Sequence, residues 1–73
     1  MAELLKRGMT GTSVRDAQSK LKKVGFDVGL VDGNFGLKME NAVKGFQTSK
    51  NFSTVDGIIG DQTWTMLNNA VGA

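Results

Sequence analysis

A five-residue pattern occurs twice in this chain, and each copy is followed by a segment with helical periodicity. The first copy is Asp32-Gly33-Asn34-Phe35-Gly36, and the second is Asp56-Gly57-Ile58-Ile59-Gly60. Asp-Gly favours a tight turn because glycine adopts positive φ without a Cβ clash and the aspartate carboxylate accepts backbone N–H bonds just ahead of it. The repeat therefore predicts two equivalent corners, with Gly36 and Gly60 at the starts of the helices that follow them.

Apolar periodicity predicts three helices, over about residues 13–24, 36–50 and 60–71. The residues that carry these periods are Val14, Ala17, Leu21 and Val24, then Met39, Ala42, Val43 and Phe46, and finally Trp64, Leu67, Ala70 and Val71. The connecting segments are too short and too rich in glycine to predict strands. We therefore expect an all-α fold, a compact three-helix bundle with two Asp-Gly corner loops, as a single domain over residues 1–73.

Local signals suggest how these helices begin and end. Ser13 is expected to be the N-cap of the first helix. Gly25 and Asn51 are expected to end the first and second helices in the left-handed conformation, and Phe26 and Phe52, which follow them, are expected to pack back into the core. Three apolar residues before the first helix are expected to lie across the helices as a lid: Leu4, Leu5 and Met9.

The composition argues against catalysis. A chain of 73 residues has no cysteine and no histidine, which removes the thiolate and imidazole ligands of zinc and the commonest general base. Asp27, Asp32 and Asn34 lie near one another in the sequence but lack the spacing and the final glutamate of a calcium loop. We therefore expect no catalytic residue, no metal and no cofactor.

Charge and hydropathy also exclude several partners. Nine lysine and arginine residues against seven aspartate and glutamate residues give a formal charge of +2, without the dense basic clusters typical of nucleic-acid binding. No apolar run is long enough for a signal peptide or a membrane span. We expect neither nucleic acid nor membrane as a partner, and an export signal, if the domain acts outside the cell, must lie outside this sequence.

Nearly the whole chain resembles the peptidoglycan-binding domain family (PGBD-like), which is found attached to bacterial and phage cell-wall hydrolases. The residues that match its pattern, in order, are Leu5, Gly8, Gly11, Val14, Gln18, Leu21, Gly25-Phe26, Asp32 to Gly36, Ala42-Val43, Phe46-Gln47, Asp56, Gly57, Gly60, Thr63, Trp64 and Leu67. Two positions depart from it: Ala17 replaces a usual leucine, and Met39 replaces the threonine that the second corner keeps as Thr63. We expect the Thr63 hydroxyl to tie its helix to the turn, a bond that the first corner lacks.

The resemblance implies a non-catalytic module that binds peptidoglycan, through either its glycan or its stem peptide, and anchors an attached catalytic domain in the extracellular cell wall. The alternative is a protein-interaction or interdomain module on the same scaffold without wall affinity. An intramolecular scaffold or pro-domain has less support. An exposed apolar patch beside the corners would favour the protein-interaction module, whereas a polar groove with one aromatic wall would favour the wall.

A wall ligand offers hydroxyls, amides, carboxylates and apolar faces, so its site should combine polar side chains with an apolar platform. The helix starts at the two corners present free N–H groups that could receive a stem-peptide carboxylate or carbonyl. The polar residues around those starts, together with the single tryptophan, are the expected ligand-binding residues: Asn34, Lys38, Asp61, Gln62 and Trp64.

Each of these assignments has a structural alternative. Trp64 lies on an apolar helical stripe and is expected in the core unless it serves as a stacking platform. The turn residues are expected to brace the corners, and they are Asp32, Gly33, Gly36, Asp56, Gly57, Gly60 and Thr63. Gln18 and Gln47 are expected to be buried amides that satisfy loop backbone, with ligand contact as the alternative.

Overall fold

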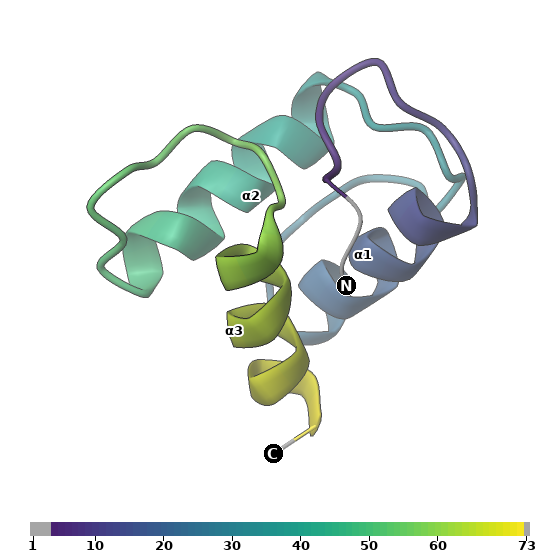
Figure 1. Cartoon of the computed structure of the whole chain (residues 1–73). Helices are drawn as coiled ribbons and strands as arrows, with labels where there is room; N and C mark the ends of the chain where they lie inside the picture. Colours follow the sequence, from purple (N-terminus) through teal and green to yellow (C-terminus); the bar gives the residue numbers. More distant parts are fainter. Residues whose placement is uncertain (1–3, 73) are drawn as a thin grey trace.

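Three helices make up the regular structure of residues 4–72, the part of the chain that the computed structural model describes (Figure 1). Helix α1 spans Thr12–Lys23, α2 spans Leu37–Ser49 and α3 spans Asp61–Gly72. The all-α expectation is confirmed, and the observed helix ends differ from the expected ones by a single residue. The first three residues and the last residue of the expected domain lie outside the described part.

The start of α1 corrects one expectation. The N-cap is Gly11, with φ 133° and no side-chain cap, and Ser13 lies inside the helix. The reason is a backbone contact that the sequence does not show: the Gly11 N–H donates to the Gly33 carbonyl (3.0 Å), while the Gly11 carbonyl accepts from the Arg15 N–H (3.1 Å). The first corner therefore sets where α1 begins.

The ends of α1 and α2 follow the expected pattern. Gly25 has φ 99°, and the N–H of Phe26 donates to the Leu21 carbonyl in the last turn of α1 (2.9 Å). Helix α2 ends in the same way, with Asn51 at φ 59° and the N–H of Phe52 bonded to a carbonyl of the last turn (3.1 Å). These bonds satisfy carbonyls that a helix end otherwise leaves free.

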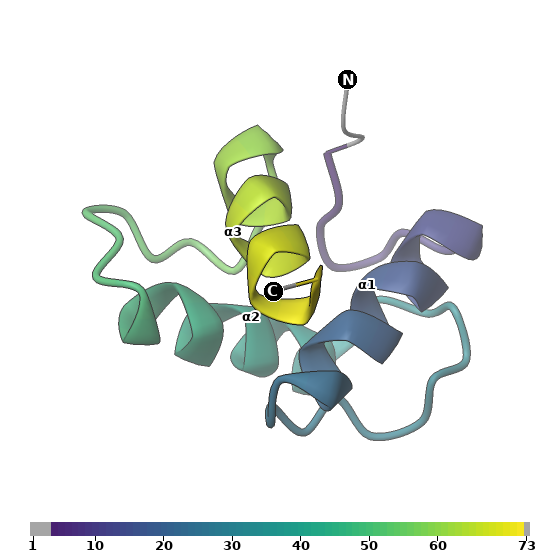
Figure 2. The ribbon, with the colours of Figure 1, turned by 90° about the horizontal axis from the view of Figure 1, so that it is seen from below.

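The core lies where the apolar faces of the helices meet. In the view nearly along α3, α1 lies to the right of α3 and α2 lies behind α3 (Figure 2). The ring of Phe26, on the connector after α1, packs edge-on against Phe46 of α2 with centroids 5.8 Å apart. Phe52 is only half-buried. The expected lid is partly wrong, because Leu5 is fully buried whereas Leu4 is 53% exposed.

The segment before α1 ties the two corners together. Leu5 and Ile59 exchange two backbone hydrogen bonds of 2.9 and 2.8 Å at the second corner. At the first corner, the Gly8 N–H donates to the Phe35 carbonyl and the Phe35 N–H donates to the Met9 carbonyl, both at 2.9 Å. Since Phe35 and Ile59 hold the same place in the two copies of the repeat, one short segment clamps both corners at equivalent positions.

Candidate functional site

The first corner is built around the side chain of Gln18, a buried residue of α1. Its Oε1 accepts the N–H of Gly33 (2.8 Å), and its Nε2 donates to the Asn34 carbonyl (2.9 Å) and to Asp32 Oδ1 (3.2 Å). Asp32 Oδ1 also accepts the Asn34 N–H (2.9 Å). One amide thus satisfies the backbone of a turn in which Gly33 has φ 80°, as expected of a buried glutamine.

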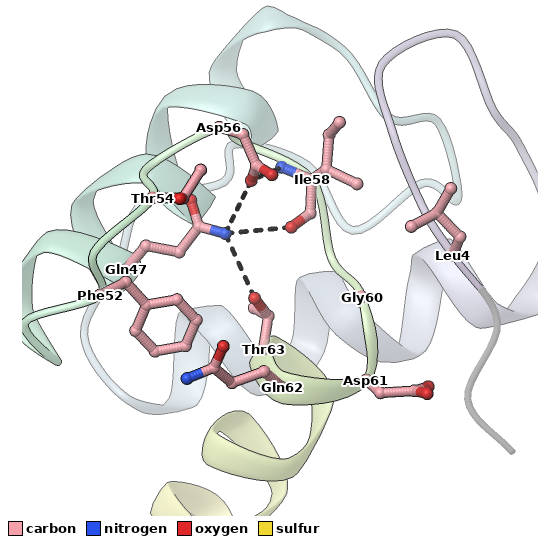
Figure 3. Close-up of a pocket in the computed structure, with 10 residues that line it drawn as sticks. All are labelled: Leu4, Gln47, Phe52, Thr54, Asp56, Ile58, Gly60, Asp61, Gln62 and Thr63. Atoms are coloured by element: carbon pink, nitrogen blue, oxygen red, sulfur yellow. Dashed lines mark hydrogen bonds between the residues drawn. The ribbon is translucent and has the colours of Figure 1, made fainter.

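Gln47 of α2 holds the second corner in the same way (Figure 3). Its Oε1 accepts the Gly57 N–H (3.0 Å), and its Nε2 donates to the Ile58 carbonyl (3.0 Å) and Asp56 Oδ1 (3.1 Å). The Nε2 also lies 3.2 Å from Thr63 Oγ1. The Thr63 hydroxyl therefore joins α3 to the turn through the central glutamine, whereas the equivalent Met39 is buried and has no hydroxyl.

Both turn aspartates are held as carboxylates. The hydrogen bond from the Ile58 N–H is the largest effect on the pKa of Asp56 and outweighs the opposing effect of burial. With a smaller contribution from the Gln47 amide, it keeps that pKa below its ordinary value of 3.8. The Asn34 N–H and then the Gln18 amide lower the pKa of Asp32 in the same way. Hydrogen bonds to the ionised form favour that form. Both carboxylates are therefore charged near neutral pH and accept bonds within their turns.

A shallow pocket of about 240 Å³ opens at the second corner, between the loop and the start of α3 (Figure 3). It is below the range of about 300–1,000 Å³ that is common for sites of drug-sized ligands. We call it the second-corner pocket, and its lining residues are Leu4, Gln47, Phe52, Thr54, Asp56, Ile58, Gly60, Asp61, Gln62 and Thr63. Asp61 and Gln62, two of the expected ligand-binding residues, both lie in it.

Two other expected ligand-binding residues lie at the first corner instead. Asn34 and Lys38 line a separate depression of about 280 Å³, together with the exposed Leu30 and Leu37. Lys38 Nζ there pairs with Asp27 Oδ2 at 3.3 Å. A further depression of about 250 Å³ lies at the start of α1 and is lined by Thr10, Gly11, Thr12, Arg15, Asp32, Gly33 and Asn34. The structure therefore divides the expected ligand-binding residues between the two corners.

Trp64 lies in the core rather than on a binding surface. It is 7% exposed, and Lys20 Nζ lies 5.3 Å from its ring centroid. The aromatic wall of the second-corner pocket is Phe52, which the sequence placed in the core. The helix-end signal at Asn51 correctly located Phe52 beside the last turn of α2, but no sequence signal indicated that its half-buried ring would face α3.

No three acidic side chains in residues 4–72 come together where they could hold a metal ion. Within the same range no helix is long and apolar enough to cross a membrane.

The family model described as "Putative peptidoglycan binding domain" matches residues 10–67, which include both corners and both central glutamines. This chain belongs to that peptidoglycan-binding domain family. The match includes the Asp-Gly turns and most of α3, so the resemblance given by the repeat and its flanking helices is confirmed.

Three relatives show how members of the family resemble this chain. It is 41% identical over 68 residues to the spore cortex-lytic enzyme of Bacillus cereus (93% of this chain, 26% of the relative) and 42% identical over 57 residues to the N-acetylmuramoyl-L-alanine amidase CwlM of Mycobacterium tuberculosis (78% and 14%). The crystal structure of the SleB N-terminal domain superposes with a TM-score of 0.90 at 39% identity, over 94% of this chain and 93% of that one. The chain thus spans between 14% and 26% of the two curated relatives.

Proposed function

We propose that this chain binds bacterial cell-wall peptidoglycan without catalysing a reaction and holds an attached hydrolase domain on that polymer. Membership of the peptidoglycan-binding domain family is the observation that carries the proposal. One curated relative is named as a spore cortex-lytic enzyme and the other as an N-acetylmuramoyl-L-alanine amidase, and the matched segment is a minor part of each. We place its site of action in the cell wall, outside the cell.

The second-corner pocket is our proposed binding site. It combines the Phe52 ring with the exposed polar side chains of Asp61 and Gln62, which is the mixture of apolar platform and hydrogen-bonding groups that a sugar or peptide requires. A shallow site of this size gives weak binding on its own. Weak binding is sufficient here because the wall is a repeating polymer and tethering raises the effective concentration of the attached enzyme.

Co-sedimentation with insoluble peptidoglycan stripped of teichoic acid tests the proposal. We expect retention at low salt and also at about 0.5 M salt, where charge attraction is screened within about 4 Å. An unrelated protein of the same net charge, +2, is the control. Retention at low salt alone would indicate charge attraction, and no retention would reject wall binding.

A matched pair of variants assigns the binding to the pocket. Gln62→Ala removes an exposed amide from its lining, and Asn69→Ala removes an exposed amide two turns further along α3, outside it. Gln62→Ala should weaken wall binding roughly two- to tenfold, the value of one hydrogen bond, without changing the unfolding midpoint. Asn69→Ala should bind as the wild type does. Equal binding by both variants would remove Gln62 from the site.

One observation favours a second candidate, a protein-interaction module. Leu30 and Leu37 are 80% and 58% exposed, and both line the depression of about 280 Å³ that Asn34 and Lys38 also line. Contiguous apolar surface that is exposed to solvent is common at sites where proteins dock. Changing both to serine should leave wall retention intact if the second corner binds the wall. Loss of retention in a folded double variant would instead place wall binding at the first corner.

A further inference from the structure

The second-corner pocket differs from its surroundings in its charge. The described residues include six carboxylates, and three of them form ion pairs: Arg7 with Glu40 (3.4 Å), Lys20 with Asp16 (3.0 Å) and Lys38 with Asp27 (3.3 Å). Asp56 and Asp61 are among the remaining three, and both line the pocket. Its ten lining residues include no lysine or arginine. On a chain with a net positive charge, this pocket is therefore locally acidic.

The start of α3 does not reverse this charge. A helix N-terminus carries the equivalent of about +0.5 elementary charge, against two full negative charges on Asp56 and Asp61. A carboxylate of the ligand would enter a field that repels it, whereas an ammonium group would be attracted. The idea that a stem-peptide carboxylate binds at the helix start after Gly60 is therefore disfavoured by the residues around it.

The walls of the pocket indicate what should accompany the ammonium group. The Phe52 ring stands at one side, with the Gln62 amide beside it, and Leu4 stands at the other, beyond Gly60 (Figure 3). Leu4 is 53% exposed and Ile58 is partly exposed, so apolar surface remains available there. Methylene groups pack against such walls while the charged end of a long side chain stays near carboxylates and water. The matching ligand is an aliphatic chain that ends in an amine.

We infer that the second-corner pocket binds the amine-bearing side chain of the diamino acid in the peptidoglycan stem peptide, so that the module recognises the peptide rather than the glycan. This inference rests on the proposed function, because it names which part of the wall polymer occupies the site. The glycan offers hydroxyls and neutral acetamides, which can donate hydrogen bonds to carboxylates but carry no opposite charge. The stem amine adds a charge opposite to that of Asp56 and Asp61, neither of which forms an ion pair within the described residues.

Two soluble peptides that differ in one group test the inference. The probes are L-alanyl-γ-D-glutamyl-L-lysine and the same peptide acetylated on its lysine Nζ, titrated into the ¹⁵N-labelled chain and followed by NMR. The free amine should bind roughly three- to tenfold more tightly, as expected for an exposed charge pair or two. The difference should shrink at about 0.5 M salt, and the shifted amides should include Gly57, Gly60 and Gln62. Equal affinities, no binding of either peptide, or shifts centred on the first corner would overturn the inference.

A pair of charge variants tests whether the preference for the free-amine peptide over the acetylated peptide arises in the second-corner pocket. Asp61→Asn removes one carboxylate from the pocket, and Asp27→Asn makes the same change at an exposed aspartate outside it. Asp61→Asn should reduce the preference for the free amine about threefold while leaving the acetylated peptide unaffected. Asp27→Asn should keep the full preference. An unchanged preference in Asp61→Asn would overturn the assignment to this pocket.

The wall assay separates this inference from the function on which it rests. Wild-type chain that fails to pellet with untreated peptidoglycan would reject wall binding itself. Wild-type chain that pellets equally with untreated peptidoglycan and with peptidoglycan whose amines have been acetylated would leave wall binding standing and reject only amine recognition. We expect retention on the untreated wall and several-fold weaker retention on the acetylated wall. A tetramer of N-acetylglucosamine should not compete.

Discussion

The two corners share one internal design but present different surfaces. In each, a buried glutamine bonds to the turn glycine N–H, to a carbonyl and to the turn aspartate. On the outside, the helix after the first corner begins with Leu37 and Lys38, whereas the helix after the second begins with Asp61 and Gln62. The buried bonds fix the path of the chain, and the residues just past the turn are left free to define a surface.

One buried difference also separates them. The second corner has an additional bond from Gln47 to Thr63, and Met39 fills the equivalent place in the first. The second corner therefore connects three elements through one side chain: α2, the loop and the start of α3. It should be the more rigid of the two, which suits a pocket that lies directly on it.

Removing the central glutamines should have the largest effect on stability. Gln47→Leu keeps the volume but leaves the Gly57 N–H, the Ile58 carbonyl and the Thr63 hydroxyl without their partner, which should cost about 3–4 kcal/mol of unfolding free energy. Gln18→Leu leaves only the Gly33 N–H and the Asn34 carbonyl without their partner, one group fewer, and should cost about 2–3 kcal/mol of unfolding free energy. Urea unfolding measures both. Equal losses would contradict the greater connectivity of the second corner.

The turn aspartates should have smaller effects. Asp56 accepts bonds from the Ile58 N–H (3.0 Å) and from Gln47 (3.1 Å), so Asp56→Ala should cost about 1–2 kcal/mol. Asp32 accepts an equivalent pair of bonds. The denaturant midpoint of Asp32→Ala should therefore fall as well, for the same reason. As a control, Asp56→Asn keeps an acceptor oxygen and should lose much less; an unchanged midpoint in Asp56→Ala would reject the bracing role.

The additional bond of the second corner can be removed alone. Thr63→Val replaces the buried hydroxyl with a methyl group of similar size and should cost about 1 kcal/mol, because Gln47 retains its other partners. Thr65→Val makes the same change at an exposed site on the same helix and should stay within about 0.5 kcal/mol of the wild type. Thermal or urea unfolding of the two variants gives the difference. If Thr63→Val behaves like Thr65→Val, the bond contributes nothing measurable.

The sequence predicted those features that depend on local signals. The apolar periods located all three helices, and the residues at Gly25 and Asn51 predicted the helix ends because a left-handed residue after a helix is a local requirement. The buried roles of Gln18 and Gln47 were also among the expected alternatives. A resemblance based on ordered, spaced residues was sufficient to identify the family.

The features that the sequence could not predict depend on contacts between distant segments. The start of α1 at Gly11 is set by the carbonyl of Gly33, 22 positions away, so the cap signal at Ser13 was misleading. Membership of the second-corner pocket depends on Leu4, Phe52 and Gln62 converging from three segments. The polarity of single residues therefore placed Asp61 and Gln62 near a common site but gave no indication of the apolar walls. It also grouped Asp61 and Gln62 with Asn34 and Lys38, which lie at the other corner.

The smallest expected effect is a shared response of the two corners to acid. The pKa values of Asp32 and Asp56 are lowered in the folded chain below the ordinary value of 3.8, so each ionised carboxylate stabilises the fold above about pH 4. That contribution is lost as the pH falls through 3.8 toward the lower folded values, because the unfolded chain then binds protons that the folded chain does not. The urea midpoint should therefore fall between about pH 5 and pH 2. In Asp32→Asn and in Asp56→Asn, the urea midpoint should decrease less with falling pH, by a similar amount in the two variants, since the two carboxylates accept equivalent bonds. A smaller decrease in only one variant would show that the corners differ in their electrostatics as well as in the Thr63 bond.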